Sequence, residues 1–101
     1  MEQKFDFIFL EQFIKRIPMY TGEEEQSLIV AFVHGYEAGK ANKNLTDEIS
    51  KILNIDYGIS KPAVGWPYQV KVYSEKNNCS WVEGFKAIIQ EIIFKHRTSY
   101  A

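Results

Sequence analysis

Residues 80–94, SWVEGFKAIIQEIIF, carry the clearest structural signal in the chain. Ser80 and Glu83 have the spacing of a capping box, in which two side chains bond the free amide groups at the start of a helix. Large apolar side chains then recur every three or four positions, which places them on one face of a helix. They are Trp81, Phe85, Ile88, Ile89, Ile92 and Ile93. This pattern predicts a long amphipathic helix whose apolar face packs against other elements.

A second apolar stripe occupies residues 4–17, where large apolar side chains lie four positions apart. They are Phe5, Phe9, Phe13 and Ile17. This spacing is typical of an amphipathic helix. Pro18 is expected to end it, because proline disfavours helical geometry in the preceding residue and has no amide hydrogen. Met19 and Tyr20 are expected to pack between this helix and the next one.

A second helix is predicted up to about Lys40, with Leu28, Ile29 and Phe32 among its apolar positions. Thr21 is expected to cap it, and the three glutamates that follow are expected to lie in its first turn, where negative charge is favourable. Gly35 and Gly39 lie four apart inside this helix. Each glycine costs about 1 kcal/mol relative to alanine, which suggests that a neighbouring helix or ring approaches closely there.

A short third helix is expected to start at Asn44, with Asp47 three residues later, and to bury Leu45, Ile49, Ile52 and Leu53. Residues 54–67 contain Gly58, Pro62, Gly65 and Pro67 and show no regular period. They are predicted to form the longest irregular connection in the chain.

A fourth helix is predicted to begin with Pro67 at its first position and to end at Asn77 and Asn78. The stretch Tyr68–Tyr73 also alternates between apolar and polar residues, so a strand is the alternative there. Together the patterns predict an all-α fold of about five helices.

The length and composition favour a single domain covering residues 1–101. The chain has 101 residues, of which 46% are hydrophobic and 15% are aromatic. These numbers suffice for one core but not for two.

The charge and the remaining composition argue against several classes of partner. Lysine and arginine number 12 against 13 acidic residues, and the net charge of −1 gives no electrostatic reason to expect nucleic acid. No segment has the roughly 18 uninterrupted apolar residues of a membrane span. Asp6 and Glu11 interrupt the N-terminal apolar run, so no signal peptide is expected, and the single Cys79 fits a reducing compartment. The sequence therefore predicts a cytoplasmic protein.

Reactive groups are few. His34 and Glu37 lie three apart and could share a helix face, but a polar surface pair explains them and a metal needs more ligands. His96 is expected to interact with the end of a helix. Cys79 precedes a helix start without an identifiable base. We therefore expect no catalytic activity, no cofactor and no bound metal.

Two groups of side chains are candidates for binding a partner. The acidic group comprises Glu23, Glu24, Glu25, Asp47 and Glu48. The aromatic group, around the irregular connection, comprises Tyr57, Trp66 and Tyr68. Acidic residues at helix starts are also explained by the helix dipole, and aromatic residues by packing. Tyrosine and tryptophan are nevertheless enriched at the energetic centres of interfaces.

Four segments together resemble a group of small bacterial proteins, some of which look like immunity proteins of polymorphic or contact-dependent toxin systems. That pattern has an arginine-proline turn with Met-Tyr-x-Gly, then Phe-x-x-Gly-Tyr, then Gly-Trp, then an aromatic and aliphatic helix. The matching residues here are Arg16 with Met19, Tyr20 and Gly22, then 32–36, then Gly65 with Trp66, then 85–94. Here the proline is Pro18, directly before Met19, and does not follow the arginine.

The resemblance implies a binding protein without catalytic activity, which neutralises one cognate toxin domain, often a nuclease, by covering its active or substrate-binding surface. The acidic and aromatic groups would supply charge complementarity and anchors. The alternative hypothesis is a small helical regulatory or structural protein that forms a homo-oligomer such as a homodimer, because the first and last helices carry more apolar residues than one core of this size needs.

Overall fold

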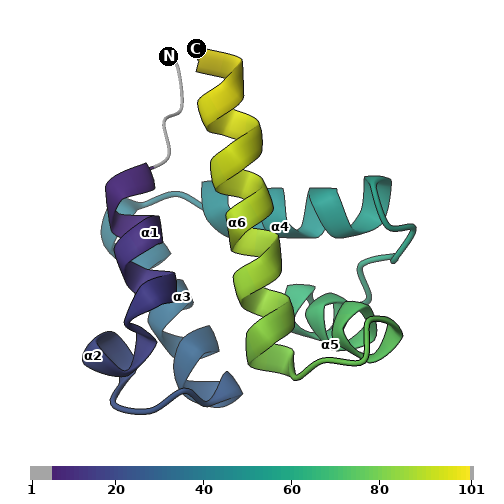
Figure 1. Ribbon diagram of the computed structural model, residues 1–101, viewed down its shortest axis with the longest axis horizontal. Helices are drawn as coiled ribbons and strands as arrows, with labels where there is room; N and C mark the ends of the chain where they lie inside the picture. Colours follow the sequence, from purple (N-terminus) through teal and green to yellow (C-terminus); the bar gives the residue numbers. More distant parts are fainter. Residues whose placement is uncertain (1–5, 101) are drawn as a thin grey trace.

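The computed structural model describes residues 6–100, with side chains up to residue 96, and contains six α-helices in that part of the chain (Figure 1). They are α1 (Phe7–Lys15), α2 (Ile17–Thr21), α3 (Gln26–Lys40), α4 (Asn44–Ile55), α5 (Trp66–Lys76) and α6 (Trp81–Tyr100). No strand occurs within residues 6–100, so the predicted all-α class is confirmed. The strand alternative for residues 68–73 is wrong, because α5 contains them. The predicted position of Phe5 in the first helix lies outside the described residues.

Helix α6 is the central element of the fold. It crosses the molecule in front of the other helices and packs against α1, α4 and α5 (Figure 1). The apolar face predicted from the sequence is confirmed, because Phe85, Ile88, Ile89, Ile92 and Ile93 are all buried. The predicted capping box is also present: the Ser80 amide donates to Glu83 Oε1 at 3.0 Å, and the Glu83 amide donates to Ser80 Oγ at 3.1 Å.

The prediction that Pro18 ends the first helix is wrong in detail. Helix α1 ends at Lys15, and Arg16 breaks the helical geometry with φ −138° and ψ 47°. Pro18 then occupies the second position of the short helix α2. Proline is tolerated in a first turn because the amide hydrogen it lacks would have no partner within the helix there. This extra helix raises the number from the predicted five to six.

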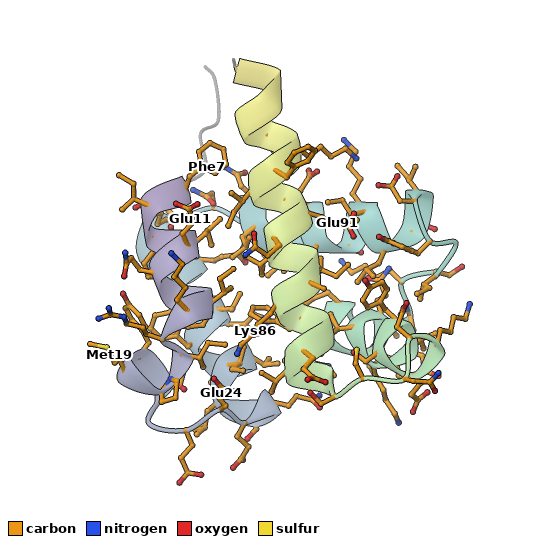
Figure 2. All side chains as sticks on the ribbon, viewed as in Figure 1. Phe7, Glu11, Met19, Glu24, Lys86 and Glu91 are labelled. Carbon is orange, nitrogen blue, oxygen red and sulfur yellow. The ribbon has the colours of Figure 1, made fainter. Side chains whose placement is uncertain are left out.

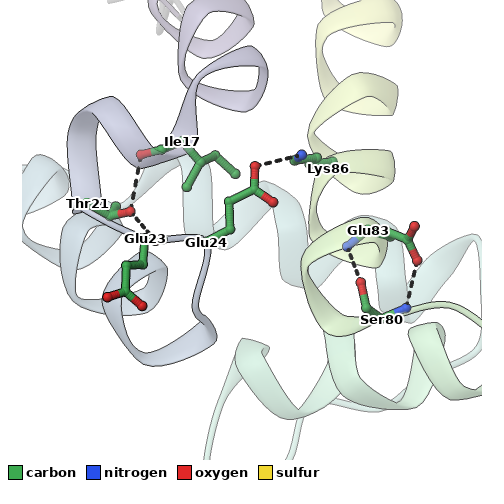
Figure 3. A network of polar contacts seen from close by, with 7 residues as sticks. All are labelled: Ile17, Thr21, Glu23, Glu24, Ser80, Glu83 and Lys86. Atoms are coloured by element: carbon green, nitrogen blue, oxygen red, sulfur yellow. Dashed lines mark hydrogen bonds and ion pairs between the residues drawn. The ribbon is translucent and has the colours of Figure 1, made fainter.

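The start of α3 also differs from the prediction. Helix α3 begins at Gln26 with Glu25 as its N-cap residue, so the three glutamates precede the first turn. Thr21 closes α2: its hydroxyl oxygen lies 3.1 Å from the Ile17 carbonyl oxygen and 2.6 Å from that of Glu23 (Figure 3). Thr21 therefore shapes the turn and does not cap α3.

Aromatic rings fill the space between α1, α2 and α3. The ring of Phe9 stacks on Tyr36 at 4.6 Å between centroids, and that of Phe13 stacks on Phe32 at 4.9 Å. Tyr20 contacts Phe13 edge to face at 5.5 Å, as expected for a residue between two helices. Met19 was expected beside it, but its side chain is exposed and points outward from α2 (Figure 2).

Helices α5 and α6 approach each other closely at Gly84. A Cβ added at Gly84 would lie 1.9 Å from Ser74 Oγ, so no larger residue fits without movement. The close approach predicted at Gly35 and Gly39 is wrong. Both residues are exposed, and no atom lies within 4 Å of a Cβ added at either position.

The irregular connection between α4 and α5 covers residues 56–65 and is tied to the core by Gln69 of α5. The Gln69 side chain is fully buried; its Oε1 accepts from Ser50 Oγ at 2.7 Å, and its Nε2 donates to the Ile59 carbonyl at 2.8 Å. Gly58 adopts a left-handed conformation with φ 68°, which ends α4 and turns the chain toward this anchor. The connection is therefore held in place although it lacks regular structure.

None of the helices in the described part of the chain combines the length and the apolar character needed to cross a membrane.

Candidate functional site

A surface depression lies where α3, the start of α4 and the connection to α5 meet. We call it the α3–α4 groove; its volume is about 800 Å³. It is lined by Val30, His34, Glu37, Ala38, Ala41, Asn42, Lys43, Thr46, Asp47, Lys61, Ala63, Val64, Gly65, Trp66 and Pro67. Small and apolar side chains form much of this lining, and charged side chains stand at its rim. This combination resembles the centre and the rim of a protein interface.

One wall of the groove is built by Glu37, whose side chain is 5% exposed. Its Oε2 accepts from the Thr46 amide at 2.7 Å, and its Oε1 accepts from the Thr46 hydroxyl at 2.8 Å. The Thr46 amide is among the first amide groups of α4, which have no partner within that helix. Glu37 therefore caps α4 from the neighbouring helix, and Asn44 is the first residue of α4, as the sequence predicts.

The floor of the groove contains Trp66, whose indole Nε1 donates to His34 Nε2 at 3.1 Å. The two rings meet nearly at right angles, with centroids 5.9 Å apart. His34 is exposed, whereas Trp66 is only 4% exposed. His34 and Glu37, interpreted as a surface pair, thus bond different partners, and only His34 lies at the surface.

The rim of the groove carries both signs of charge. Lys43, Asp47 and Lys61 are exposed there, and within residues 6–96 none of the three forms an ion pair. These groups are therefore available to charged groups of a partner. The carboxylate of Glu37 is not, because both of its oxygens accept from Thr46.

The structure brings part of the predicted partner-binding set to the groove. Asp47 lies on the rim, and Tyr68, which is exposed, directly follows the lining residue Pro67. Glu25 lines a smaller depression that shares Val30 with the groove. Trp66 also lines the groove, but it is buried in the core and exposes little surface to a partner.

Two predicted glutamates, Glu23 and Glu24, lie between α2 and α3 and do not line the groove. Glu24 Oε2 lies 3.2 Å from Lys86 Nζ, an ion pair that joins the segment before α3 to α6 (Figures 2 and 3). Both side chains are partly exposed, so the pair contributes little to stability. Glu23 is exposed beside the Thr21 turn (Figure 3).

Two other predicted residues hold α4 and its C-terminal turn against α6. Glu48 Oε2 lies 3.1 Å from His96 Nε2, so the His96 ring faces a carboxylate of α4. The Tyr57 hydroxyl donates to Glu91 Oε2, and its ring meets Tyr73 edge to face at 4.9 Å. The hydrogen bond to the Glu91 carboxylate, with a smaller effect of burial, raises the pKa of Tyr57 above its ordinary value.

Sequence reasoning missed several residues of the groove, notably Ala38, Ala63, Lys43 and Lys61. Alanine and lysine are so common on helix surfaces that neither type signals a site by itself. One pattern does indicate an exposed, smooth face on α3. Its exposed positions include the small residues Ala31, Gly35, Ala38 and Gly39.

These features define a small all-α domain with a surface groove. The buried carboxylate of Glu37 caps α4 and forms one wall of that groove. Comparisons of the chain with family models, with curated proteins and with solved structures give no match. Among the described residues, no group of three histidine, cysteine, aspartate or glutamate side chains is placed to hold a metal ion.

Proposed function

We propose that this chain is an immunity protein that binds one cognate toxin domain in the cytoplasm and covers its active or substrate-binding surface. The observation that carries the proposal is the α3–α4 groove, whose lining combines apolar side chains with polar ones and with three exposed charges that form no ion pair among the described residues. Such a surface suits a protein partner, because burial of apolar atoms supplies affinity and the rim supplies specificity. A role of this kind requires no reactive group.

The groove sits on a framework that is held in one shape. Glu37 joins α3 to α4, and Gln69 joins the irregular connection to α4 and α5. A preformed surface loses little conformational entropy on binding, which favours the high affinity that neutralising a toxin requires. The resemblance of the sequence to immunity-type proteins supports the same role.

Two of the predicted acidic residues indicate which charges a partner would carry. Asp47 lies on the rim of the groove, and Glu25 lies in the depression beside it. On a toxin that acts on nucleic acid, these two carboxylates would complement basic groups of the substrate surface, and Lys43 and Lys61 would meet acidic groups beside it. Tyr68 is placed beside the same edge as an exposed aromatic contact.

Co-expression of the chain with a candidate toxin domain, sought first in the neighbouring genes, tests this function. Protection of growth and a stable complex in size-exclusion chromatography are expected. Failure of the wild-type chain in both measurements would reject the immunity function.

The surface assignment is tested with Ala38→Arg, which fills the groove from an exposed position on α3. We expect it to weaken toxin binding at least about tenfold, because the arginine occupies the apolar centre. Gln12→Arg, at an exposed position of α1, is the matched control and should bind as tightly as wild type. Equal binding by both variants, with unfolding temperatures equal to wild type, would show that the toxin binds elsewhere.

A second candidate function is that of a small homo-oligomeric regulatory or structural protein. Ile8 on α1 is 73% exposed and Phe94 on α6 is 72% exposed. The start of α1 and the end of α6 lie at the same end of the molecule (Figure 1). Exposed large apolar side chains at one end favour self-association.

Sedimentation of the isolated protein at micromolar concentration separates the two candidates. A concentration-dependent dimer that Ile8→Glu and Phe94→Glu convert to monomer would support the oligomer. A strict monomer in this range would remove it.

A further inference from the structure

The hydrogen bond between Trp66 and His34 defines the protonation state of the histidine. An indole Nε1–H can only donate, so His34 Nε2 must accept with a lone pair. In a neutral imidazole the proton then resides on Nδ1. The 3.1 Å contact therefore assigns His34 as the neutral Nδ1–H tautomer.

Protonation of His34 would place an N–H group on both ring nitrogens. Two donors would then face each other across the floor of the groove, and the bond would be lost. Trp66 is 4% exposed, so water does not readily replace the lost acceptor. The indole must then shift or remain without a partner, which is unfavourable for a buried N–H group.

The charged groups around this pair do not substitute for the bond. Glu37 on α3 is occupied by Thr46, and Lys43, Asp47 and Lys61 face the same groove from α4 and from the connection. Within the described residues none of these four is hydrogen-bonded or ion-paired to His34.

We infer that His34 is a proton-sensitive hydrogen-bond acceptor that fixes the position of Trp66 beneath the α3–α4 groove. With neutral His34 the indole is held and the groove has the shape described above. With protonated His34 the indole is released and the floor of the groove rearranges. Histidine is the side chain that commonly provides such a switch near neutral pH.

The test uses the two indole N–H resonances of the ¹⁵N-labelled protein between about pH 8 and about pH 5, the range in which histidine usually changes charge. Trp81→Phe assigns them. The Trp66 resonance should move with the same midpoint as the ring resonances of His34. A long-range ¹H–¹⁵N spectrum at the upper pH should show the proton on Nδ1.

Trp81 is an internal control, because its indole donates to the Pro67 carbonyl, which does not titrate in this range. His34→Gln supplies an amide oxygen that can accept from Trp66 at every pH, so the Trp66 resonance should no longer move. His96→Gln removes the other histidine, which pairs with Glu48, and should leave the movement unchanged.

The inference is overturned by a proton on Nε2 of His34 at the upper pH, by a Trp66 resonance that stays fixed through the range, or by equal movement in His34→Gln. All of these measurements use the isolated chain. The effect on toxin affinity rests on the proposed function, whereas the tautomer and the resonance shift do not, so the two ideas fail separately.

Discussion

Glu37 on α3 and Thr46 on α4 are joined by two hydrogen bonds, of 2.7 and 2.8 Å, that use both oxygens of one buried carboxylate. The residues are nine positions apart, and the turn between the helices brings them together. The same contact caps α4, fixes the angle between two helices and forms a wall of the groove.

Replacing Glu37 with alanine should therefore lower the free energy of unfolding by roughly 2–4 kcal/mol, since a helix amide is left buried without a partner. Glu37→Gln should lose less, because its amide oxygen still accepts one bond. Urea denaturation measures both. Glu75→Ala, on the exposed face of α5, is the control and should stay close to wild type. A Glu37→Ala variant as stable as this control would contradict the capping role.

The crossing of α5 and α6 depends on the missing side chain of Gly84. Gly84→Ala should destabilise the fold by about 1–3 kcal/mol, because its methyl group collides with Ser74 Oγ. In the described part of the chain that hydroxyl is buried without a hydrogen-bond partner, so Ser74→Ala should be neutral or stabilising. The double variant should be more stable than Gly84→Ala alone. Strict additivity in thermal unfolding would show that the collision is not the cause.

Gly35 offers the opposite case within another helix. It lies on an exposed face of α3 with open space where a side chain would be. Gly35→Ala should therefore raise the free energy of unfolding by about 0.5–1 kcal/mol through helix propensity alone. The midpoint of urea denaturation gives the sign directly, and a decrease would show that the backbone there needs glycine.

Gln69 should control the stability and the order of residues 56–65. Gln69→Ala removes the bonds to Ser50 and Ile59 and leaves a cavity, so a loss of about 2–4 kcal/mol is expected. Cleavage of the connection by a protease under native conditions should become faster. Exposed Gln90→Ala serves as the control. Unchanged cleavage of the Gln69 variant would mean that other contacts hold the connection.

Tyr57 should make stability depend on alkaline pH. Its pKa is raised in the folded state by the bond to Glu91, so the folded chain holds this proton more tightly than the unfolded chain. The contribution is complete below the ordinary tyrosine pKa of about 10 and is lost as the pH rises above it. The difference in stability between wild type and Tyr57→Phe should therefore shrink above about pH 10. A constant difference would contradict the assignment.

The features that the sequence predicts well are local ones. Residues 80–94 contain both the cap and the apolar period of α6, so nothing distant is needed to find that helix. The all-α class follows from several such segments. The short helix α2, which begins at Ile17, was not predicted. Pro18 was interpreted as the end of the first helix, although proline fits the first turn of a helix equally well.

The contacts that shape the candidate site join different helices. The apolar periodicity within one helix cannot predict such contacts. From the sequence alone, Glu37 is expected at the helix surface. Only the fold shows that Thr46 of α4 lies against it and buries it. Gly84 and Gly35 both lie within predicted helices, so the sequence does not distinguish them. The structure shows that Gly84 is required where α6 crosses α5, whereas Gly35 has open space around it. The sequence left Trp66 open between core packing and partner contact, and only the three-dimensional placement shows that it is buried.

The position of α6 in the chain has a consequence for biosynthesis. Helices α1, α4 and α5 all pack against it, yet it is the last of the described helices to leave the ribosome. Until its residues emerge, the parts of α1, α4 and α5 that pack against α6 remain uncovered. Cooperative folding of this chain must therefore follow translation of α6, and incomplete nascent chains should be the species that chaperones bind.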